Sequence, residues 1–228
     1  MIISKEIFIN SIQKGKAVEN WIKQDKKAIE KKLGVCVSAM QGFDQRNPHH
    51  CYNLLSHCLH TCDNLEYFGK RDAVVRTAAF FHDLGKPVVV KEKQGRLVFY
   101  GHADMSAKLV KPMLLQMGYS KAEVLDIIFL IGHHDDFISY VLADKYLPGK
   151  GKTLITAESV KKYYAALRRK YAYISTAHLW ELLEELLALM TADCKAQSEY
   201  VYMQGVLVDS REEKVKRLEK IKKYIFNL

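Results

Sequence analysis

Apolar residues recur at helical spacing along most of this chain, and few helix-breaking residues interrupt them. Its 228 residues include only four prolines and twelve glycines. Since proline removes a backbone donor and glycine weakens a helix interior, this scarcity leaves long stretches able to be helical. The pattern predicts helices over residues 4–32, 49–67, 71–84, 102–118, 120–134, 135–145, 156–171, 176–204 and 209–226.

One segment departs from the helical pattern. Val88–Val90 and Leu97–Tyr100 are runs of β-branched, aliphatic and aromatic residues, and a polar tip at Gln94-Gly95 separates them. Such runs on both sides of a glycine-containing tip predict a β-hairpin. The expected fold class is therefore all-α with one small hairpin.

The chain is expected to form a single domain. Its length is sufficient for one well-buried core, and it contains no internal repeat, low-complexity tract or linker. The expected parts are a core at about 47–204 with an insertion at about 143–178, an N-terminal helix at 4–32 and a C-terminal helix at 209–226.

Several features predict a cytoplasmic protein with no membrane partner. No apolar stretch reaches the roughly 18 residues of a membrane-spanning helix. Charges at Lys5 and Glu6 interrupt the short apolar start, which is unlike a signal peptide. The five cysteines are odd in number and include no CxxC pair, so reduced structural thiols are expected rather than a disulfide framework or a zinc ribbon.

The charge of the chain is compatible with a phosphate-bearing partner, including RNA. The formal net charge is +9, which attracts phosphates in general but also serves solubility alone. Cations and rings alternate over 161–171, where they either hold phosphates and stack a base or form an amphipathic helix with packed tyrosines. No feature of the sequence indicates an oligomeric state.

His82 and Asp83 are adjacent at the end of the apolar run 78–81. Neighbouring side chains on a helix point about 100° apart, so the pair can coordinate one ion together or take part in binding two ions. Burial beside Phe80 and Phe81 costs several kcal/mol unless a partner satisfies both polar groups. A divalent metal would do so.

Two further candidate ligands stand far apart in the sequence. His57 lies within a predicted helix, and Asp193 closes another apolar segment. With His82 and Asp83 they form a set of nitrogen and oxygen donors that suits iron, manganese, nickel, cobalt or zinc. A lone histidine on an apolar helix is more often a packed core residue, so the ordered series, rather than any one member, indicates the metal.

The series His…His-Asp…Asp resembles the HD-domain superfamily of metal-dependent phosphohydrolases, and most closely the HD portion of CCA-adding tRNA nucleotidyltransferases. The resemblance covers roughly residues 47–142 and 185–198. It is carried by Asn47-Pro48-His49-His50-Cys51-Tyr52-Asn53, by His82-Asp83-Leu84-Gly85-Lys86-Pro87, and by Phe99-Tyr100-Gly101-His102 followed by Ser106-Ala107. It implies an HD-type helical bundle that hydrolyses phosphate esters.

The chain also departs from those enzymes. Residues 1–46 are too short for the nucleotidyltransferase domain that precedes the HD region there, and they lack its paired aspartates, so CCA addition is not expected. Residues 143–178 have no family counterpart and are expected to shape the substrate site.

The resemblance to binuclear HD families implies a second ion, bridged by Asp83 and held by His102 and His133. The adjacent His134 is the alternative to His133, and His102 would otherwise contact substrate. Two ions roughly 3.5–4 Å apart polarise phosphoryl oxygens and hold a bridging hydroxide.

Three more residues are candidates for roles beside the metal. Lys86, three residues after Asp83, is expected to bind a phosphate or the leaving oxygen, and otherwise is a solvated cation at a helix end. His60, one turn after His57, is either an orienting partner of a ligand or a packed histidine. His50 is included by the resemblance alone.

The expected function is hydrolysis of a phosphomonoester or phosphodiester of a nucleotide or nucleic-acid end by a metal-activated water. Two other functions fit the same residues. One is a di-iron oxygenase with the same ligand order, and the other is a non-catalytic HD module that binds a nucleotide or RNA.

Overall fold

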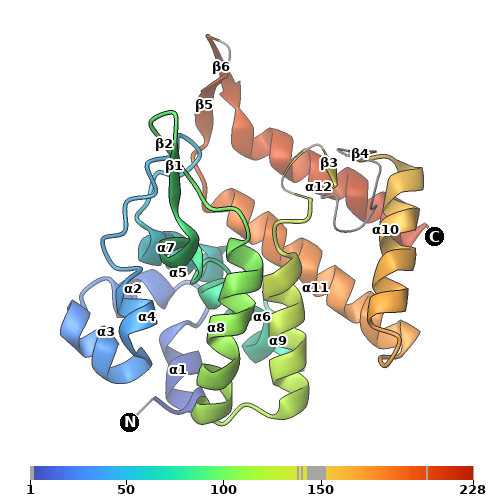
Figure 1. Ribbon diagram of the computed structural model, residues 1–228. Coiled ribbons are helices and arrows are strands. Elements are labelled where there is room, and N and C mark those ends of the chain that lie inside the picture. Colours follow the sequence, from blue (N-terminus) through green and yellow to red (C-terminus); the bar gives the residue numbers. More distant parts are fainter. Residues whose placement is uncertain (1–2, 138, 140, 143–152, 204, 228) are drawn as a thin grey trace.

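The protein is mostly helical in a computed structural model that describes residues 3–137, 139, 141–142, 153–203 and 205–227 (Figure 1). The described helices are α1 (Lys5–Ser11), α2 (Ala17–Trp21), α3 (Lys26–Leu33), α4 (Val35–Ser38), α5 (Leu54–Asn64), α6 (Asp72–Phe81), α7 (Lys86–Val89), α8 (His102–Met117), α9 (Lys121–His133), α10 (Ala157–Lys170), α11 (Thr176–Lys195) and α12 (Ser210–Phe226). The all-α expectation is confirmed. None of the helices in the described ranges is long and apolar enough to cross a membrane.

The described strands form three antiparallel pairs. These pairs are β1 (Lys91–Lys93) with β2 (Arg96–Val98), β3 (Val141–Leu142) with β4 (Thr153–Leu154), and β5 (Tyr200–Met203) with β6 (Val206–Asp209). The first pair is a hairpin after the His-Asp motif, as predicted, and Gln94 and Gly95 at its tip both have the positive φ that a tight hairpin turn requires. Its first strand was misplaced, because Val88 and Val89 belong to helix α7 and the strand is Lys91–Lys93. The other two pairs were not predicted.

Helix α6 is the centre of the hydrophobic core. Every residue from Val74 to Phe81 is buried. The α6 rings Phe80 and Phe81 pack against Phe8 of α1, and Phe80 also packs against Trp21 of α2. Each such ring contributes roughly 1.5–3 kcal/mol by burial. This packing fixes the end of α6, where the His-Asp pair follows.

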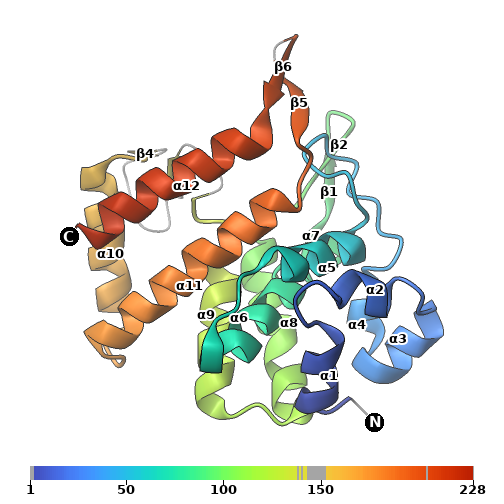
Figure 2. The same ribbon diagram turned by 180° about the vertical axis from the view of Figure 1, so that it is seen from behind.

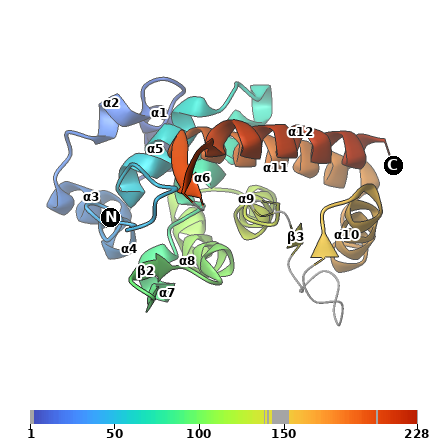
Figure 3. The same ribbon diagram turned by 90° about the horizontal axis from the view of Figure 1, so that it is seen from above.

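Helices α5, α9 and α11 surround α6, and α8 packs on α9. The α1–α4 segment lies on one side of these helices and α10 on the other, in both front and top views (Figures 1 and 3). Helix α12 runs along α11 and contacts α10 (Figure 2). The ends of α5, α6, α8, α9 and α11 thereby converge on one region.

Local capping sets where these helices begin. Asn53 accepts a hydrogen bond from the backbone N of Ser56 (2.9 Å), so α5 starts at residue 54 rather than 49. Ser120 and Glu123 form a reciprocal capping box at the start of α9. Left-handed glycines, Gly101 and Gly118, flank α8.

Three further element predictions were wrong. The helix expected over 4–32 is three helices, because Gly15 adopts a positive φ after α1 and Asp25 caps a new helix by accepting from Ala28 N. The helix expected over 176–204 ends at Lys195, before β5. Residues 135–137 form a turn and Val141–Leu142 a strand, where a helix over 135–145 was expected. Residues 143–152 of the expected insertion lie outside the described ranges.

Candidate metal centre

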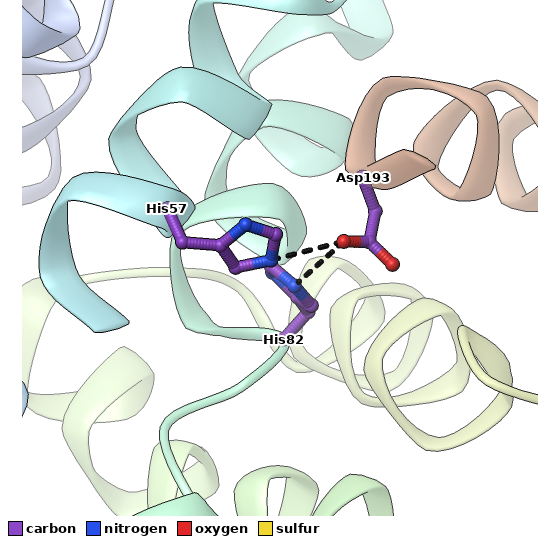
Figure 4. A group of neighbouring side chains, drawn as sticks. All are labelled: His57, His82 and Asp193. Carbon is purple, nitrogen blue, oxygen red and sulfur yellow. Dashed lines mark ion pairs between the residues drawn. The ribbon is translucent and has the colours of Figure 1, made fainter. Parts of the chain in front are cut away.

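The ends of three helices bring His57, His82 and Asp193 together (Figure 4). His57 is on α5, His82 follows the last residue of α6, and Asp193 is near the end of α11. Oδ1 of Asp193 lies 2.9 Å from Nε2 of His57 and 3.7 Å from Nε2 of His82. All three side chains are at most 3% exposed. The residues are separated by up to 136 positions, so only the tertiary fold assembles this group.

Asp83 joins this group through one oxygen and a second group through the other. Its Oδ2 lies 3.4 Å from Nε2 of His57 and 3.2 Å from Nε2 of His82. Its Oδ1 lies 3.1 Å from Nε2 of His102 and 3.5 Å from Nε2 of His134. Asp83, His102 and His134 are close enough together to hold an ion of their own. The carboxylate therefore lies between two groups of imidazoles.

Backbone carbonyls orient all four imidazoles in the same way. The Nδ1 atoms of His57, His82, His102 and His134 donate to the carbonyl oxygens of Ala196 (3.2 Å), Ala79 (2.7 Å), Phe99 (2.9 Å) and Ile131 (2.7 Å). Because a carbonyl only accepts, each Nδ1 carries the proton and each Nε2 has its lone pair free for a metal. This orientation suits all four rings as candidate metal ligands.

Three of the candidate donor atoms lack a hydrogen bond. Among the described residues, Nε2 of His57, Nε2 of His82 and Oδ1 of Asp83 are buried without a hydrogen-bond partner of acceptable geometry. Such atoms cost about 1–3 kcal/mol each when left unsatisfied. The donor set and these atoms fit a divalent ion.

The structure corrects the choice between the two adjacent histidines. His133 belongs to neither donor group. Its Nδ1 lies 2.7 Å from Oδ2 of Asp136 and its Nε2 lies 2.7 Å from the Tyr171 hydroxyl. His134, one residue on, faces Asp83 instead, because successive residues at the end of α9 point about 100° apart.

Without an ion, opposite charges share the site. Burial lowers the pKa of His57 and His82, but the neighbouring carboxylates outweigh this effect and raise both above the ordinary value, that of His82 well above it. Burial likewise opposes ionisation of Asp83, yet His82 and Lys86 hold its pKa well below the usual range. Asp193, beside His57 and His82, is also held well below it. A bound metal would take the place of the imidazole protons.

Lys86 is buried and lies beside the shared carboxylate. Its Nζ is 2.6 Å from Oδ2 of Asp83 and donates to Oε1 of Gln45 at 2.8 Å, and its side chain is only 6% exposed. It also sits 5.3 Å from the centre of the Phe99 ring. This environment is inconsistent with a solvated cation at a helix end.

The two remaining histidine candidates differ in position. His50 stands with its ring 5.0 Å from that of His57, and burial together with the Lys86 charge lowers its pKa to about 2. His50 is therefore an uncharged side chain that lines the site. His60 is stacked on Tyr52, with ring centres 4.1 Å apart, and belongs to neither donor group.

Gly85 allows the His-Asp segment to press against α8. A Cβ at this position would lie 2.6 Å from the His102 carbonyl oxygen and 2.7 Å from the Ser106 nitrogen. The Gly85 N–H donates to Oγ of Ser106 at 2.8 Å. The absence of a side chain therefore brings His102 to Asp83.

Other residues near the site were not predicted. Cys58 on α5 lies beside His82 and Asp83, but burial raises the pKa of its thiol, which disfavours the thiolate that binds metals. Gln197 donates to Oδ1 of Asp193 at 3.1 Å and accepts from Nζ of Lys214 at 2.5 Å. In the sequence, the only indication that Gln197 lies near the site is its position four residues after Asp193, about one helical turn away.

A cleft of about 530 Å³ opens onto the two donor groups, which is large enough for a small organic ligand. Asp83, His102, His134 and Asp193 line it, together with Lys86. Further walls come from the end of the first hairpin, including Phe99 and Tyr100, and from α12 through Ser210, Glu213, Lys214 and Arg217.

A comparison with protein families matches residues 49–165, more than half of the chain, to the model described as the HD domain. The matched segment includes His57, His82, Asp83, His102 and His134, whereas Asp193 lies beyond it. It also covers residues 143–165, so the expectation that all of 143–178 lacks a family counterpart was wrong. No match was found among curated proteins.

Proposed function

Because the chain belongs to the HD-domain family, we propose that it is a metal-dependent phosphohydrolase that cleaves a phosphate ester of a nucleotide or of a nucleic-acid end. The observation that carries this proposal is the position of Asp83 between two groups of imidazoles. A carboxylate shared in this way is what two neighbouring divalent ions need in order to act on one phosphoryl group.

The residues divide naturally between two ions. His57, His82, Asp83 and Asp193 would hold the first, and Asp83, His102 and His134 would hold the second. When bound, such ions polarise a phosphoryl oxygen and lower the pKa of a coordinated water to supply the nucleophile. The nitrogen and oxygen donors suit iron, manganese, nickel, cobalt or zinc.

The chain's own groups prepare the site for a phosphate. Lys86 can donate from Nζ to a phosphoryl oxygen while Asp83 and Gln45 hold it in place. Its charge would stabilise the negative charge that develops there or on the leaving oxygen. The Phe99 ring and the neutral His50 shield this ammonium from water and so strengthen its attraction for an anion. The resemblance to CCA-adding enzymes supports a nucleotide or nucleic-acid end as the substrate.

Lys86 also favours this function over the two others considered. The buried ammonium beside the shared carboxylate suits a negatively charged phosphate ester, because hydrogen bonds between charged groups are the strong ones. A module that only binds RNA or a nucleotide would not require two complete donor groups.

The first test is turnover. Metal-stripped protein is refilled with manganese, nickel, iron or zinc and assayed on phosphomonoester, phosphodiester and 2′,3′-cyclic nucleotide substrates. Metal-dependent hydrolysis that disappears in Asp193→Ala is expected. Oxygen consumption by an iron-loaded protein that hydrolyses none of these esters would instead indicate the oxygenase.

The second test is metal content. Purified wild type is expected to hold two ions per chain, His134→Ala one, and His57→Ala fewer than wild type, by elemental analysis. His60→Ala removes a histidine from the same helix as His57 but outside both donor groups, so it should retain two. Equal metal loss in the His57 and His60 variants would contradict the assignment.

A further inference from the structure

Helix α12 contributes a cation to the cleft that the metal site does not use. Lys214 is half-buried and lines the cleft. Its Nζ donates to Oε1 of Gln197 at 2.5 Å and lies 3.4 Å from Nδ1 of His49. Burial, followed by the charges of Lys214 and Arg96, lowers the pKa of His49, so this ring is neutral near pH 7. Lys214 therefore has two neutral partners.

No carboxylate of the described residues lies within 4.0 Å of the Lys214 ammonium. Burial and the charge of Arg217 lower the pKa of Lys214, although Asp193 and Glu213 act in the opposite direction. Arg217, three residues later and so on the same face of α12, lines the same wall. Glu213 also borders the cleft but is exposed to solvent. This wall would gain stability from a bound anion.

The position of Lys214 relative to the metal ligands limits what that anion can be. Gln197 connects Lys214 to Asp193 through one amide and two hydrogen bonds, of 2.5 and 3.1 Å. Such a bridge spans at most about 8 Å. Because the Gln197 amide lies between them, Lys214 does not contact the Asp193 carboxylate itself, and an anion that it binds can be a group of the substrate other than the phosphate at the metal centre.

The remaining wall offers a surface for a base. Leu97, Phe99 and Tyr100 line it, and Tyr100 is 76% exposed, which leaves its ring accessible for stacking. The cleft volume of about 530 Å³ suits a single nucleotide unit.

We propose that Lys214, with Arg217, binds a second phosphate of the substrate, so that the substrate is a nucleotide unit carrying phosphates on two sides of its sugar. This inference rests on the proposed phosphohydrolase function, since one phosphate must lie at the metal centre and beside Lys86. Lys214 then selects substrate and takes no part in breaking the ester bond.

The test compares two nucleotides that differ by one phosphate. Equilibrium binding of adenosine 3′,5′-bisphosphate and adenosine 5′-monophosphate is measured on the metal-loaded protein, and phosphate release is followed in the same samples so that only unhydrolysed nucleotide is counted. Wild type is expected to prefer the bisphosphate by about ten- to a hundredfold, as for a charge-assisted contact. Lys214→Gln should lose most of that preference and Lys214→Arg should keep it.

The control is Lys216→Gln, which removes the same charge from the same helix. Lys216 is exposed and paired with Glu212, so its loss should leave the preference within about twofold of wild type. If Lys214→Gln lowers the affinity for both nucleotides equally, or changes neither affinity, the assignment of a second-phosphate site is wrong. An oligonucleotide with a terminal 3′-phosphate, bound with the same dependence on Lys214, would support the site and identify the substrate as a nucleic-acid end.

Turnover separates this inference from the function on which it rests. Hydrolysis of phosphate esters without a Lys214-dependent preference would overturn the second-phosphate site alone. A Lys214-dependent preference in a protein that hydrolyses no ester with any metal would support the site and contradict the phosphohydrolase.

Discussion

Lys86 is the residue whose removal most directly tests for phosphate chemistry. Lys86→Met keeps the length of the side chain but removes the charge beside Asp83. Losing one donor to a developing negative charge typically costs a hundred- to a thousandfold in kcat, so a drop of that order is expected in steady-state hydrolysis. Lys91→Met, at an exposed position on β1, is the matched control and should retain activity. A Lys86 variant with wild-type turnover would remove this residue from the mechanism.

The sequence could predict most of the candidate donor residues, but not how every side chain is oriented in the fold. The order of His57, His82, Asp83 and Asp193 was sufficient to group them, because buried polar residues at the ends of apolar helices need a common partner. The choice of His133 over His134 depended on which face of α9 packs inward. Adjacent side chains differ by about 100° there, and the contacts of His133 with Asp136 and Tyr171 decide between them.

The contact between the end of α6 and α8 depends on Gly85. Gly85→Ala would place a Cβ 2.6 Å from a backbone oxygen that cannot retreat cheaply. Overpacking of this kind costs about 1–3 kcal/mol, and a loss of that size in the free energy of unfolding is expected from urea titration.

Gly132 provides the control for that substitution. It lies within α9 and nothing stands within 4 Å of a Cβ built there. Gly132→Ala should stabilise the helix by roughly 0.5–1 kcal/mol. If both variants shift stability in the same direction by the same amount, the steric argument at Gly85 fails.

Elements with strong local signals were predicted well, and those set by tertiary context were not. Helices α8, α9, α10 and α12 were expected within two residues of their bounds, because their periodic apolar faces are closed by caps and glycines. The long helix expected at the N-terminus divides into three, since Gly15 and Asp25 act locally against a continuous pattern. The β5–β6 pair was missed because its alternating residues continue the apolar run of α11, and Gly205, with a positive φ in the loop between the two strands, was overlooked.

Across the whole molecule, the pKa shifts predict how stability of the metal-free protein changes with pH. Asp83 and Asp193, with lowered pKa values, contribute stability that is lost as pH falls below about 4. His57 and His82, with raised values, contribute stability that is present below about pH 6.5 and is lost as pH rises above it. The free energy of unfolding should therefore be greatest between these limits.

Denaturant titrations at pH 5, 7 and 9 check this dependence. In chelator, unfolding should become easier from pH 5 to pH 9. Saturating metal should reduce or reverse that trend, because ligating imidazoles bind as the neutral form. A metal-free protein that is most stable at pH 9 would contradict the charge assignment.

The packing of α12 on α11 explains why the sequence did not predict one wall of the cleft. The wall formed by α12 depends on its packing along α11, far from the His-Asp motif in sequence. In the sequence, the charges of this segment indicate a solvated helical face, and only the tertiary contacts of Lys214 with Gln197 and His49 distinguish it.

The six candidate ligands lie in helices α5, α8 and α11 or just after the ends of α6 and α9, and they span residues 57 to 193. An ion that coordinates them acts as a cross-link across most of the core, and its binding free energy is added to that of folding. Melting temperature should then rise with the occupancy of the centre. This coupling offers a substrate-free way of ranking candidate metals by the heat resistance that each confers.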